Sequence, residues 1–344
     1  MEKLRVVYLA PENSGVAWYR FYQPLKDLEE RGIIELQGCG FDFTHKTLDL
    51  PTTKQVRDFS VWGDVFIFGR RDTKDWQRMI ETVKNFSGKP VLLDIDDNIF
   101  AISPYLQARG AYHPDGEFIK NHKETAKLVD GIIVSTPALQ EIYKEYNKTW
   151  IVPNGIKYVY DKIPHQTVNI GYMCSASHLE NAQLVEGAII RVLEKNPNVK
   201  FYFTKAFGGF MEGVPEHIKD RINYVPFFPL DNYLSYVRNL GLDIGIAPLM
   251  DNDFNKCKSN IRILEYWQNQ MAVVASPVGE YVKTITDGYD GFLTNDWEDV
   301  LNDLVRSKEK RDYVVKNSRE TLQKYDVSNF SNKYYEILQS IVNV

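Results

Sequence analysis

Short apolar runs alternate with amphipathic segments along the whole chain of 344 residues, and this alternation constrains the fold more than any other feature. Such an order predicts an α/β fold, in which parallel strands form a sheet and helices cover both of its faces. In the first half, strands are expected at 5–10, 34–39, 65–69, 90–95, 131–135 and 150–152. Helices are expected at 16–31, 73–86 and 137–146, the last capped by Thr136, whereas 99–121 is expected to be irregular.

The pattern restarts after the sequence VPNGI at 152–156, where a polar stretch precedes a new apolar run. Further elements are expected at 167–173, 181–194, 199–204, 222–225, 231–240 and 296–308, with one or two helices over 311–344. A chain of this length suits two domains of roughly 150 to 180 residues. We therefore predict an N-terminal domain over 1–158 and a C-terminal domain over 159–324.

Composition excludes several classes of protein. The sequence contains no run of about 18 apolar residues that could form a membrane span. Its first residues resemble a strand and a turn rather than a secretion signal. A cytoplasmic protein is therefore expected, although peripheral contact with a membrane is compatible with the sequence. The three cysteines show no paired spacing, which argues against disulfides and structural zinc. A formal charge of −5 without a basic stripe argues against tight nucleic-acid binding.

The segment 243–293 has the layout of a site for a phosphorylated ligand. An apolar run ends in a polar loop, and Ser259 then stands where the N-cap of a helix is expected. The free amides at such a helix start can face an anion. Lys258 lies beside this start, and Arg262 and Glu265 share one face of the helix. Cations suit a diphosphate and a carboxylate suits two ribose hydroxyls, so the segment predicts a nucleoside diphosphate site.

The same segment resembles the C-terminal half of the retaining glycosyltransferases of the GT-B fold, often called family 4 or group 1. The shared pattern is APL, FNxxKSxxRxxEY, VVASxVGxY and DGxxGFL, over about fifty residues. The resemblance implies two Rossmann-like domains facing across a cleft, with a terminal helix at about 325–344 returning to the N-terminal domain. It also implies a hexosyltransferase that moves a sugar from a nucleotide sugar to an acceptor hydroxyl, on a glycan, a protein or another compound, with retention.

Roles for individual residues follow from this resemblance. The family usually has a Glu eight residues before the ribose-binding Glu, and since Cys257 occupies that position, we assign its catalytic role to Lys258. The other expected catalytic residues are Arg262 and Asp97. Donor-binding roles are expected for Gly15, His178, Lys205, Ser259, Asn260, Glu265 and Gly279. Acceptor-side roles are expected for Asp96 and Arg20.

The acidic run DIDD at 94–97 has two interpretations. Carboxylates at the end of a parallel strand point towards the crevice of the sheet. Asp94 and Asp96 could bind a divalent metal as a DxD motif, as in glycosyltransferases of the GT-A fold. They could instead orient the acceptor or support the loop, and we favour this interpretation because the cationic site in the other half already suits the diphosphate. No metal and no cofactor are therefore expected.

Other functions are compatible with the same sequence. A GT-B fold also supports sugar-nucleotide epimerases and phosphorylases, and Cys257 leaves open a non-catalytic protein that binds nucleotide sugars or glycans. Glycosylation of modified nucleic-acid bases is a narrower variant of the transferase hypothesis. A nicotinamide cofactor has little support, because the turn around Gly15 does not match GxGxxG.

Overall fold

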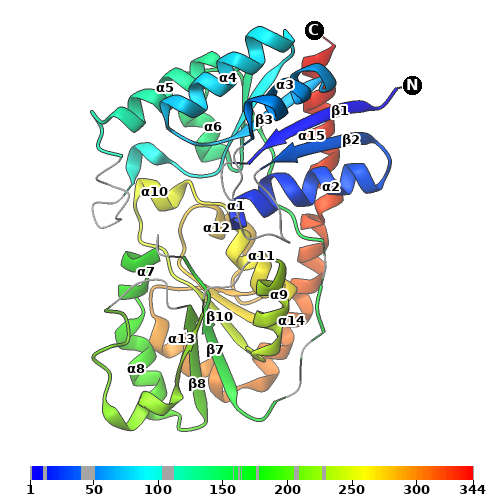
Figure 1. Cartoon of the computed structure of the whole chain (residues 1–344). Helices are drawn as coiled ribbons and strands as arrows, with labels where there is room; N and C mark the ends of the chain where they lie inside the picture. The colour runs from blue at the N-terminus through cyan, green and yellow to red at the C-terminus, as the bar shows by residue number, and fades with distance from the viewer. Residues whose placement is uncertain are drawn as a thin grey trace.

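A computed structural model describes residues 2–10, 14–39, 51–102, 112–157, 159–161, 163, 165–175, 178–204, 209–226 and 230–343. The described residues form two parallel sheets of six strands, each in its own lobe (Figure 1). The first has the order β2-β1-β3-β4-β5-β6, with β1 Leu4–Leu9, β2 Ile34–Cys39, β3 Val65–Gly69, β4 Val91–Ile95, β5 Gly131–Val134 and β6 Thr149–Ile151. The second has the order β12-β11-β10-β7-β8-β9, with β7 Val168–Tyr172, β8 Val199–Thr204, β9 Ile222–Val225, β10 Ile244–Ala247, β11 Ala272–Ala275 and β12 Phe292–Leu293. The expected α/β fold of two domains with parallel sheets is confirmed.

Helices cover both faces of each sheet (Figure 1). In the N-terminal lobe they are α1 Gly15–Ala17, the π-helix η1 Trp18–Tyr22, α2 Gln23–Glu30, α3 Thr53–Trp62, α4 Lys74–Ser87, η2 Ile99–Ala101, α5 Glu117–Leu128 and α6 Pro137–Tyr143. In the C-terminal lobe they are α7 Leu179–Gln183, α8 Glu186–Lys195, η5 Glu216–Arg221, α9 Leu230–Asn239, α10 Asp253–Lys256, α11 Ile261–Gln268, α12 Glu280–Thr284, α13 Trp297–Arg306 and α14 Lys308–Leu322. The short helix η6 Gln323–Tyr325 leads into the last helix, α15 Val327–Val342.

Local signals explain where several helices begin. The Thr136 hydroxyl accepts a hydrogen bond from the Leu139 amide at the start of α6, so the expected cap is confirmed. The irregular structure expected over 99–121 is wrong at its end, because α5 begins at Glu117 directly after Gly116. The turn residues there precede a helix. The helix expected over 16–31 contains the π-helix η1, which is an uncommon element.

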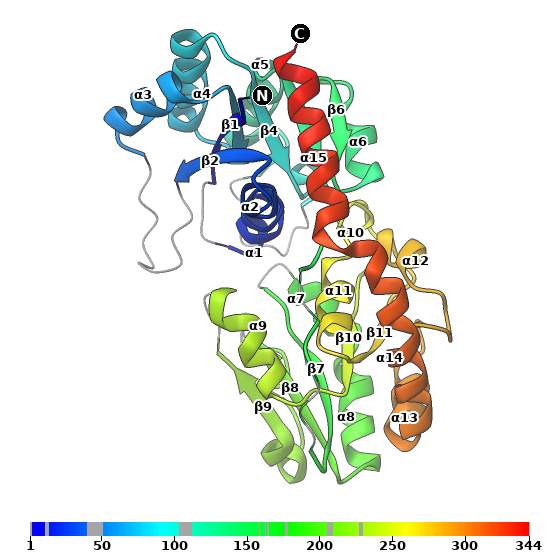
Figure 2. The ribbon, with the colours of Figure 1, turned by 90° about the vertical axis from the view of Figure 1, so that its right-hand side faces the viewer.

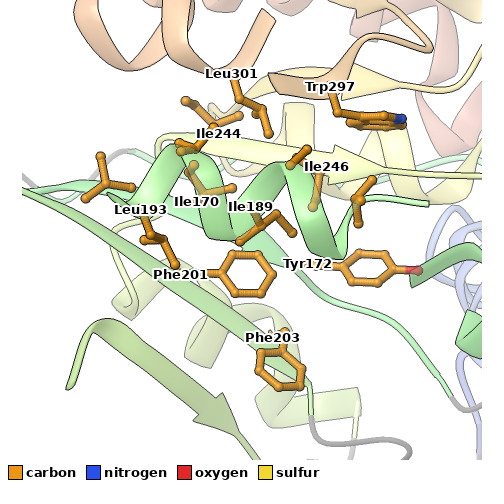
Figure 3. Packing of buried hydrophobic residues seen from close by; sticks show 14 of the residues in the cluster. Ile170, Tyr172, Ile189, Leu193, Phe201, Phe203, Ile244, Ile246, Trp297 and Leu301 are labelled. Carbon is orange, nitrogen blue, oxygen red and sulfur yellow. The ribbon is translucent and has the colours of Figure 1, made fainter. Parts of the chain in front are cut away.

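The sheet of the C-terminal lobe is buried on both faces. Alternate residues of a strand point to opposite faces. Thus Ile244 and Ile246 of β10 pack with α8 and α13, whereas Ala247 packs in the cluster on the other face, which includes residues of α11 and α12. Figure 3 shows the first of these clusters, to which Ile170 and Ile244 of the strands and Leu301 of α13 all belong. Strands buried on both sides read as continuous apolar runs, which is why they could be located from sequence.

The chain crosses between the lobes twice, and the two crossings pair with each other. The Ile156 amide donates to the Tyr325 carbonyl at 2.9 Å, and the Val327 amide donates to the Ile156 carbonyl at 2.9 Å. After this point α15 runs along the N-terminal lobe, as Figure 2 shows, and buries Tyr334 and Leu338 in that lobe's apolar cluster. The expected return of the terminal helix to the N-terminal domain is confirmed. Among the described helices, none has the length and apolar character that a bilayer crossing requires.

A methyl group at Gly155 should disturb this double crossing. A Cβ there would lie 2.9 Å from the Val327 Cα and 2.8 Å from a ring carbon of Phe330. We expect Gly155→Ala to lower the free energy of unfolding by about 1–3 kcal/mol, because the backbones must separate. Gly213→Ala is the control, since no atom lies within 4 Å of its added Cβ. Chemical denaturation of both variants measures the difference, and equal stability would contradict the tight crossing.

Candidate functional site

A cleft of about 350 Å³ lies between the two lobes. Residues of both lobes line it, and they include many of the residues assigned from sequence. The assigned residues that line the cleft are Gly15, Arg20, Asp96, Asp97, His178, Lys258, Ser259, Arg262 and Glu265. The other described lining residues are Ser14, Val16, Tyr19, Asn154, Cys174, Ser175, Thr204, Pro226, Tyr233, Ile261 and Tyr281. Lys205 lies outside the described residues.

The helix α11 supplies an anchored carboxylate. Arg262 and Glu265 lie one turn apart, and Arg262 Nη1 is 3.0 Å from Glu265 Oε2. The other carboxylate oxygen accepts a hydrogen bond of 2.9 Å from the Tyr19 hydroxyl, which comes from the N-terminal lobe. Burial raises the pKa of Glu265, while Arg262 and Tyr19 oppose that rise. Glu265 is thus a buried, oriented acceptor of hydrogen bonds at the junction of the two lobes.

The start of α11 differs in detail from expectation. The N-cap is Asn260 rather than Ser259, and it makes no capping bond with its side chain. The side-chain amide of Asn260 instead donates a hydrogen bond of 3.0 Å to the Thr284 hydroxyl, so the Asn260 side chain points towards α12. The Ser259 hydroxyl accepts a hydrogen bond of 2.9 Å from Asn154, in the segment that links the lobes. The Ser259 side chain is therefore bound to the linker and does not cap the helix.

Gly279 directly precedes α12. Its φ of 56° is in the left-handed region, and a Cβ there would lie 2.9 Å from the Lys256 carbonyl oxygen. The residue thus allows the turn after β11 to pack against α10. Neither Gly279 nor Asn260 is among the residues that line the cleft.

Lys258 and Asp97 face each other across the cleft. Lys258 Nζ is 3.5 Å from Asp97 Oδ1, and it also lies over the Phe254 ring at 4.4 Å from the centroid. The preceding residue, Cys257, points elsewhere. It belongs to an apolar cluster of the N-terminal lobe, where the Asn98 amide is 3.6 Å from its sulfur. Of these two neighbours, Lys258 is the one that can reach a ligand in the cleft.

Arg20 is built into the fold, although it was assigned to the acceptor side. Its guanidinium binds both carboxylate oxygens of Asp94, at 2.8 and 3.0 Å, and also bonds to the Val152 carbonyl and to Asn154. Arg20 is 1% and Asp94 3% exposed. The Tyr334 hydroxyl of α15 also reaches Asp94, at 3.4 Å. These bonds engage the Asp94 carboxylate within the protein, which disfavours the DxD interpretation and agrees with support of the loop.

Asp96 has an altered proton affinity. Burial and the neighbouring Asp97 carboxylate raise the pKa of Asp96 from 3.8 to about 7, against the opposing effect of Arg70 and Arg20. Asp96 can therefore change its charge near neutral pH at the N-terminal wall of the cleft. Within the described part of the chain, no group of three or more His, Cys, Asp or Glu side chains is arranged to hold a metal ion.

His178 lies on the C-terminal wall, directly before α7. Its Nδ1 is 3.2 Å from the amide nitrogen of Asn181. Burial, together with the positive charges of Lys258 and Arg262, lowers the pKa of His178 well below its usual range. The imidazole is therefore neutral.

Among the lining residues that received no role from sequence, Tyr19, Asn154 and Tyr233 bond to assigned site residues. Tyr19 bonds to Glu265, Asn154 bonds to Ser259, and the Tyr233 hydroxyl is 3.4 Å from Arg262. Each makes its contact with a residue far away along the chain, so no local spacing indicates it. The one available signal was the Asn of VPNGI, beside the expected hinge.

Comparisons with known proteins bear on the fold. No protein-family model matches the chain, and no curated protein sequence matches it. Among solved structures, it is similar to HepE from Anabaena in complex with UDP-glucose, with a TM-score of 0.67 and 14% identity over 98% of this chain and 100% of that chain.

Two further structures extend this likeness. Sucrose-phosphate synthase from Thermosynechococcus elongatus has a TM-score of 0.67 and 12% identity, over 98% of both chains. The pneumococcal O-GlcNAc transferase GtfA, in complex with UDP and GlcNAc, has a TM-score of 0.61 and 16% identity, over 87% of this chain and 62% of that chain. At such identities the likeness concerns the fold alone. With its two parallel sheets and its returning terminal helix, the chain has the GT-B fold of these glycosyltransferases.

Proposed function

We propose that the chain transfers a hexosyl group from a nucleoside diphosphate sugar to an acceptor hydroxyl. The observation that carries this proposal is the composition of the cleft. Lys258, Arg262 and Glu265 lie on the C-terminal wall, and Asp96 and Asp97 lie on the opposite wall. Cations and a carboxylate suit the diphosphate and the ribose of a donor, as argued from sequence. Structures of similar fold that were solved with UDP-glucose or UDP support the choice of donor.

On the donor side, the cations act on the leaving group. When the bond between the anomeric carbon and the diphosphate oxygen breaks, negative charge grows on the diphosphate. Lys258 and Arg262 are already in place, so they stabilise this charge without reorganisation. Glu265 accepts hydrogen bonds from the ribose hydroxyls, since each of its oxygens has a second lone pair beyond those used by Tyr19 and Arg262. Transfer without a metal ion is part of this proposal.

On the acceptor side, Asp96 and Asp97 orient the hydroxyl that attacks. The new bond joins the acceptor oxygen to the anomeric carbon on the face that the diphosphate leaves, which gives retention. The acceptor proton passes to an oxygen of the departing diphosphate, so no separate base is required. The two walls of the cleft come from different lobes. When the lobes close around the substrates, they exclude water that would hydrolyse the donor.

The test of this function is release of nucleoside diphosphate that depends on an acceptor. A panel of nucleotide sugars is screened by thermal shift, and the sugars that bind are then assayed with glycan and small hydroxyl acceptors. A transferase releases the diphosphate when the acceptor is added. Conversion of the nucleotide sugar without any acceptor would indicate an epimerase, and binding with no release under any condition would indicate a non-catalytic protein.

In that assay, Lys258→Met should lower kcat by roughly 100-fold, because one preorganised charge opposite the leaving group is removed. The Kd for the nucleotide sugar should rise much less. Lys256→Met is the matched control, since Lys256 lies two residues away, is half exposed and pairs with Asp251 outside the cleft. A kcat that is unchanged in the Lys258 variant would contradict the role of this residue.

Replacement of Glu265 should abolish nucleotide binding. The Glu265→Ala variant loses the acceptor for the ribose hydroxyls, and hydrogen bonds to a charged group contribute about 1.5–3 kcal/mol each. We expect the stabilisation by uridine diphosphate, seen as a thermal shift, to disappear. Glu216→Ala is the control, because that side chain is 87% exposed and does not line the cleft. A full thermal shift in the Glu265 variant would show that the ribose assignment is wrong.

The raised pKa of Asp96 predicts a dependence of stability on pH. A carboxyl whose pKa is raised by folding favours the folded state while it is protonated, and this contribution is lost as pH rises from about 4, where the unfolded carboxyl ionises, to about 7, where the folded one does. Asp96→Asn removes the charge. The variant should be more stable than the wild type by roughly 2–4 kcal/mol at a pH of about 8.5, and the gain should nearly vanish at a pH of about 4, where the unfolded carboxyl is also largely protonated.

Thermal unfolding at both pH values measures this effect. Asp75→Asn is the control, because the Asp75 side chain is 92% exposed and its replacement should change little at either pH. A gain for Asp96→Asn that is the same at both pH values would contradict the raised pKa.

A further inference from the structure

Asn181 connects His178 to the backbone beside the cleft. Its side-chain oxygen accepts hydrogen bonds of 2.9 Å from the Met250 amide and 2.9 Å from the Asn255 side chain. Its side-chain nitrogen is 3.2 Å from His178 Nδ1. Asn181 is 2% exposed, so its side chain is surrounded by these protein groups rather than by solvent.

The backbone fixes the orientation of both amides. The Met250 N–H can only donate, so the Asn181 atom that meets it must be the oxygen. The Met250 carbonyl can only accept, and it receives the Asn255 side-chain nitrogen at 3.0 Å. The Asn181 nitrogen must therefore face His178 and donate to it. It follows that Nδ1 of His178 carries no proton, and that the single proton of the neutral ring is on Nε2.

The surroundings of His178 agree with a neutral ring. Lys258 and Arg262 are the charged groups whose fields act on it, and both are positive. The Tyr172 hydroxyl of β7 bonds to the His178 carbonyl oxygen and not to its ring. A second ring proton would face the N–H of Asn181. Among the described residues Nε2 has no hydrogen-bond partner, and the residue lines the cleft.

We propose that Asn181 is a positioning residue that holds His178 in its neutral Nε2–H form, so that His178 donates a hydrogen bond to a diphosphate oxygen of the donor. This inference rests on the proposed function. The Lys258 and Arg262 cations that would bind the diphosphate act on the same ring. His178 adds a donor there without adding a third positive charge. Because Asn181 blocks Nδ1, the ring takes up no proton even when the anionic donor is bound.

The variant Asn181→Asp tests this assignment. The new carboxylate can still accept from Met250 and Asn255, but it also accepts from the ring and therefore moves the proton to Nδ1. At a pH of about 8 the ring is neutral with a lone pair on Nε2, so the Kd for UDP-glucose should rise roughly tenfold. At a pH of about 5.5 the ring gains a second proton beside the carboxylate. The Nε2–H donor is then restored, and the Kd should return to within about threefold of the wild type at the same pH.

The ratio of the variant to the wild type at each pH removes the contribution of Asp96, and UDP-glucose has no phosphate group that titrates in this range. The double variant Asn181→Asp with His178→Gln is the matched control. The glutamine places an amide nitrogen near the Nε2 position and cannot titrate, so the ratio should no longer depend on pH.

Two measurements separate the outcomes. Long-range NMR spectra of the wild-type protein, with its histidines labelled with ¹⁵N, read the tautomer directly even if the variant folds poorly, and a proton on Nδ1 would overturn the inference. A loss of affinity in Asn181→Asp that is equal at both pH values would also overturn it, while leaving the proposed function in place. If the wild type binds none of the nucleotide sugars in the panel, the proposed function fails, and this inference fails with it.

Discussion

The buried ion pair between Arg20 and Asp94 holds together the region in which the two lobes meet. A buried guanidinium is tolerated only when its charge and its donors are satisfied. Here Asp94 supplies the charge, and the linker supplies two further acceptors through Val152 and Asn154. Asn154 in turn donates to Ser259 at the start of the helix that carries Arg262 and Glu265. The wall expected to bind the donor is thus positioned relative to the N-terminal lobe by one connected set of hydrogen bonds.

The contacts across the cleft itself are different in kind. Tyr19 reaches Glu265 with one hydrogen bond, and Lys258 approaches Asp97 at 3.5 Å. Each of these is a single polar contact, and water or a ligand can bond to the same groups when the lobes separate. A donor that supplies its own anionic and hydroxyl groups can replace them at small cost. The bonds around Arg20 can therefore stay intact while the bonds between Tyr19 and Glu265 and between Lys258 and Asp97 are replaced by contacts with substrate.

How far sequence predicted the molecule depends on the range of each interaction. The strands 34–39 and 222–225 and the cap at Thr136 rest on local patterns, and the structure has them where they were expected. Many site residues assigned from the resemblance also line one cleft. The bond between Tyr19 and Glu265 joins residues 246 positions apart, and nothing in either local sequence indicates it. The burial of Arg20 was missed for the same reason, since its partners come from two other segments, the strand that carries Asp94 and the linker at Val152 and Asn154.

The position of Cys257 shows how tertiary contact decides between adjacent residues. Consecutive residues after α10 point in different directions, so Lys258 enters the cleft and Cys257 packs into the N-terminal lobe. The backbone carbonyl of Cys257 also accepts a hydrogen bond of 3.0 Å from the Thr136 hydroxyl. An ionised carboxylate at this position would lose its hydration within an apolar cluster, which is costly. A thiol fits because this part of the loop serves the contact between lobes, whereas Lys258 carries its ammonium group into the cleft.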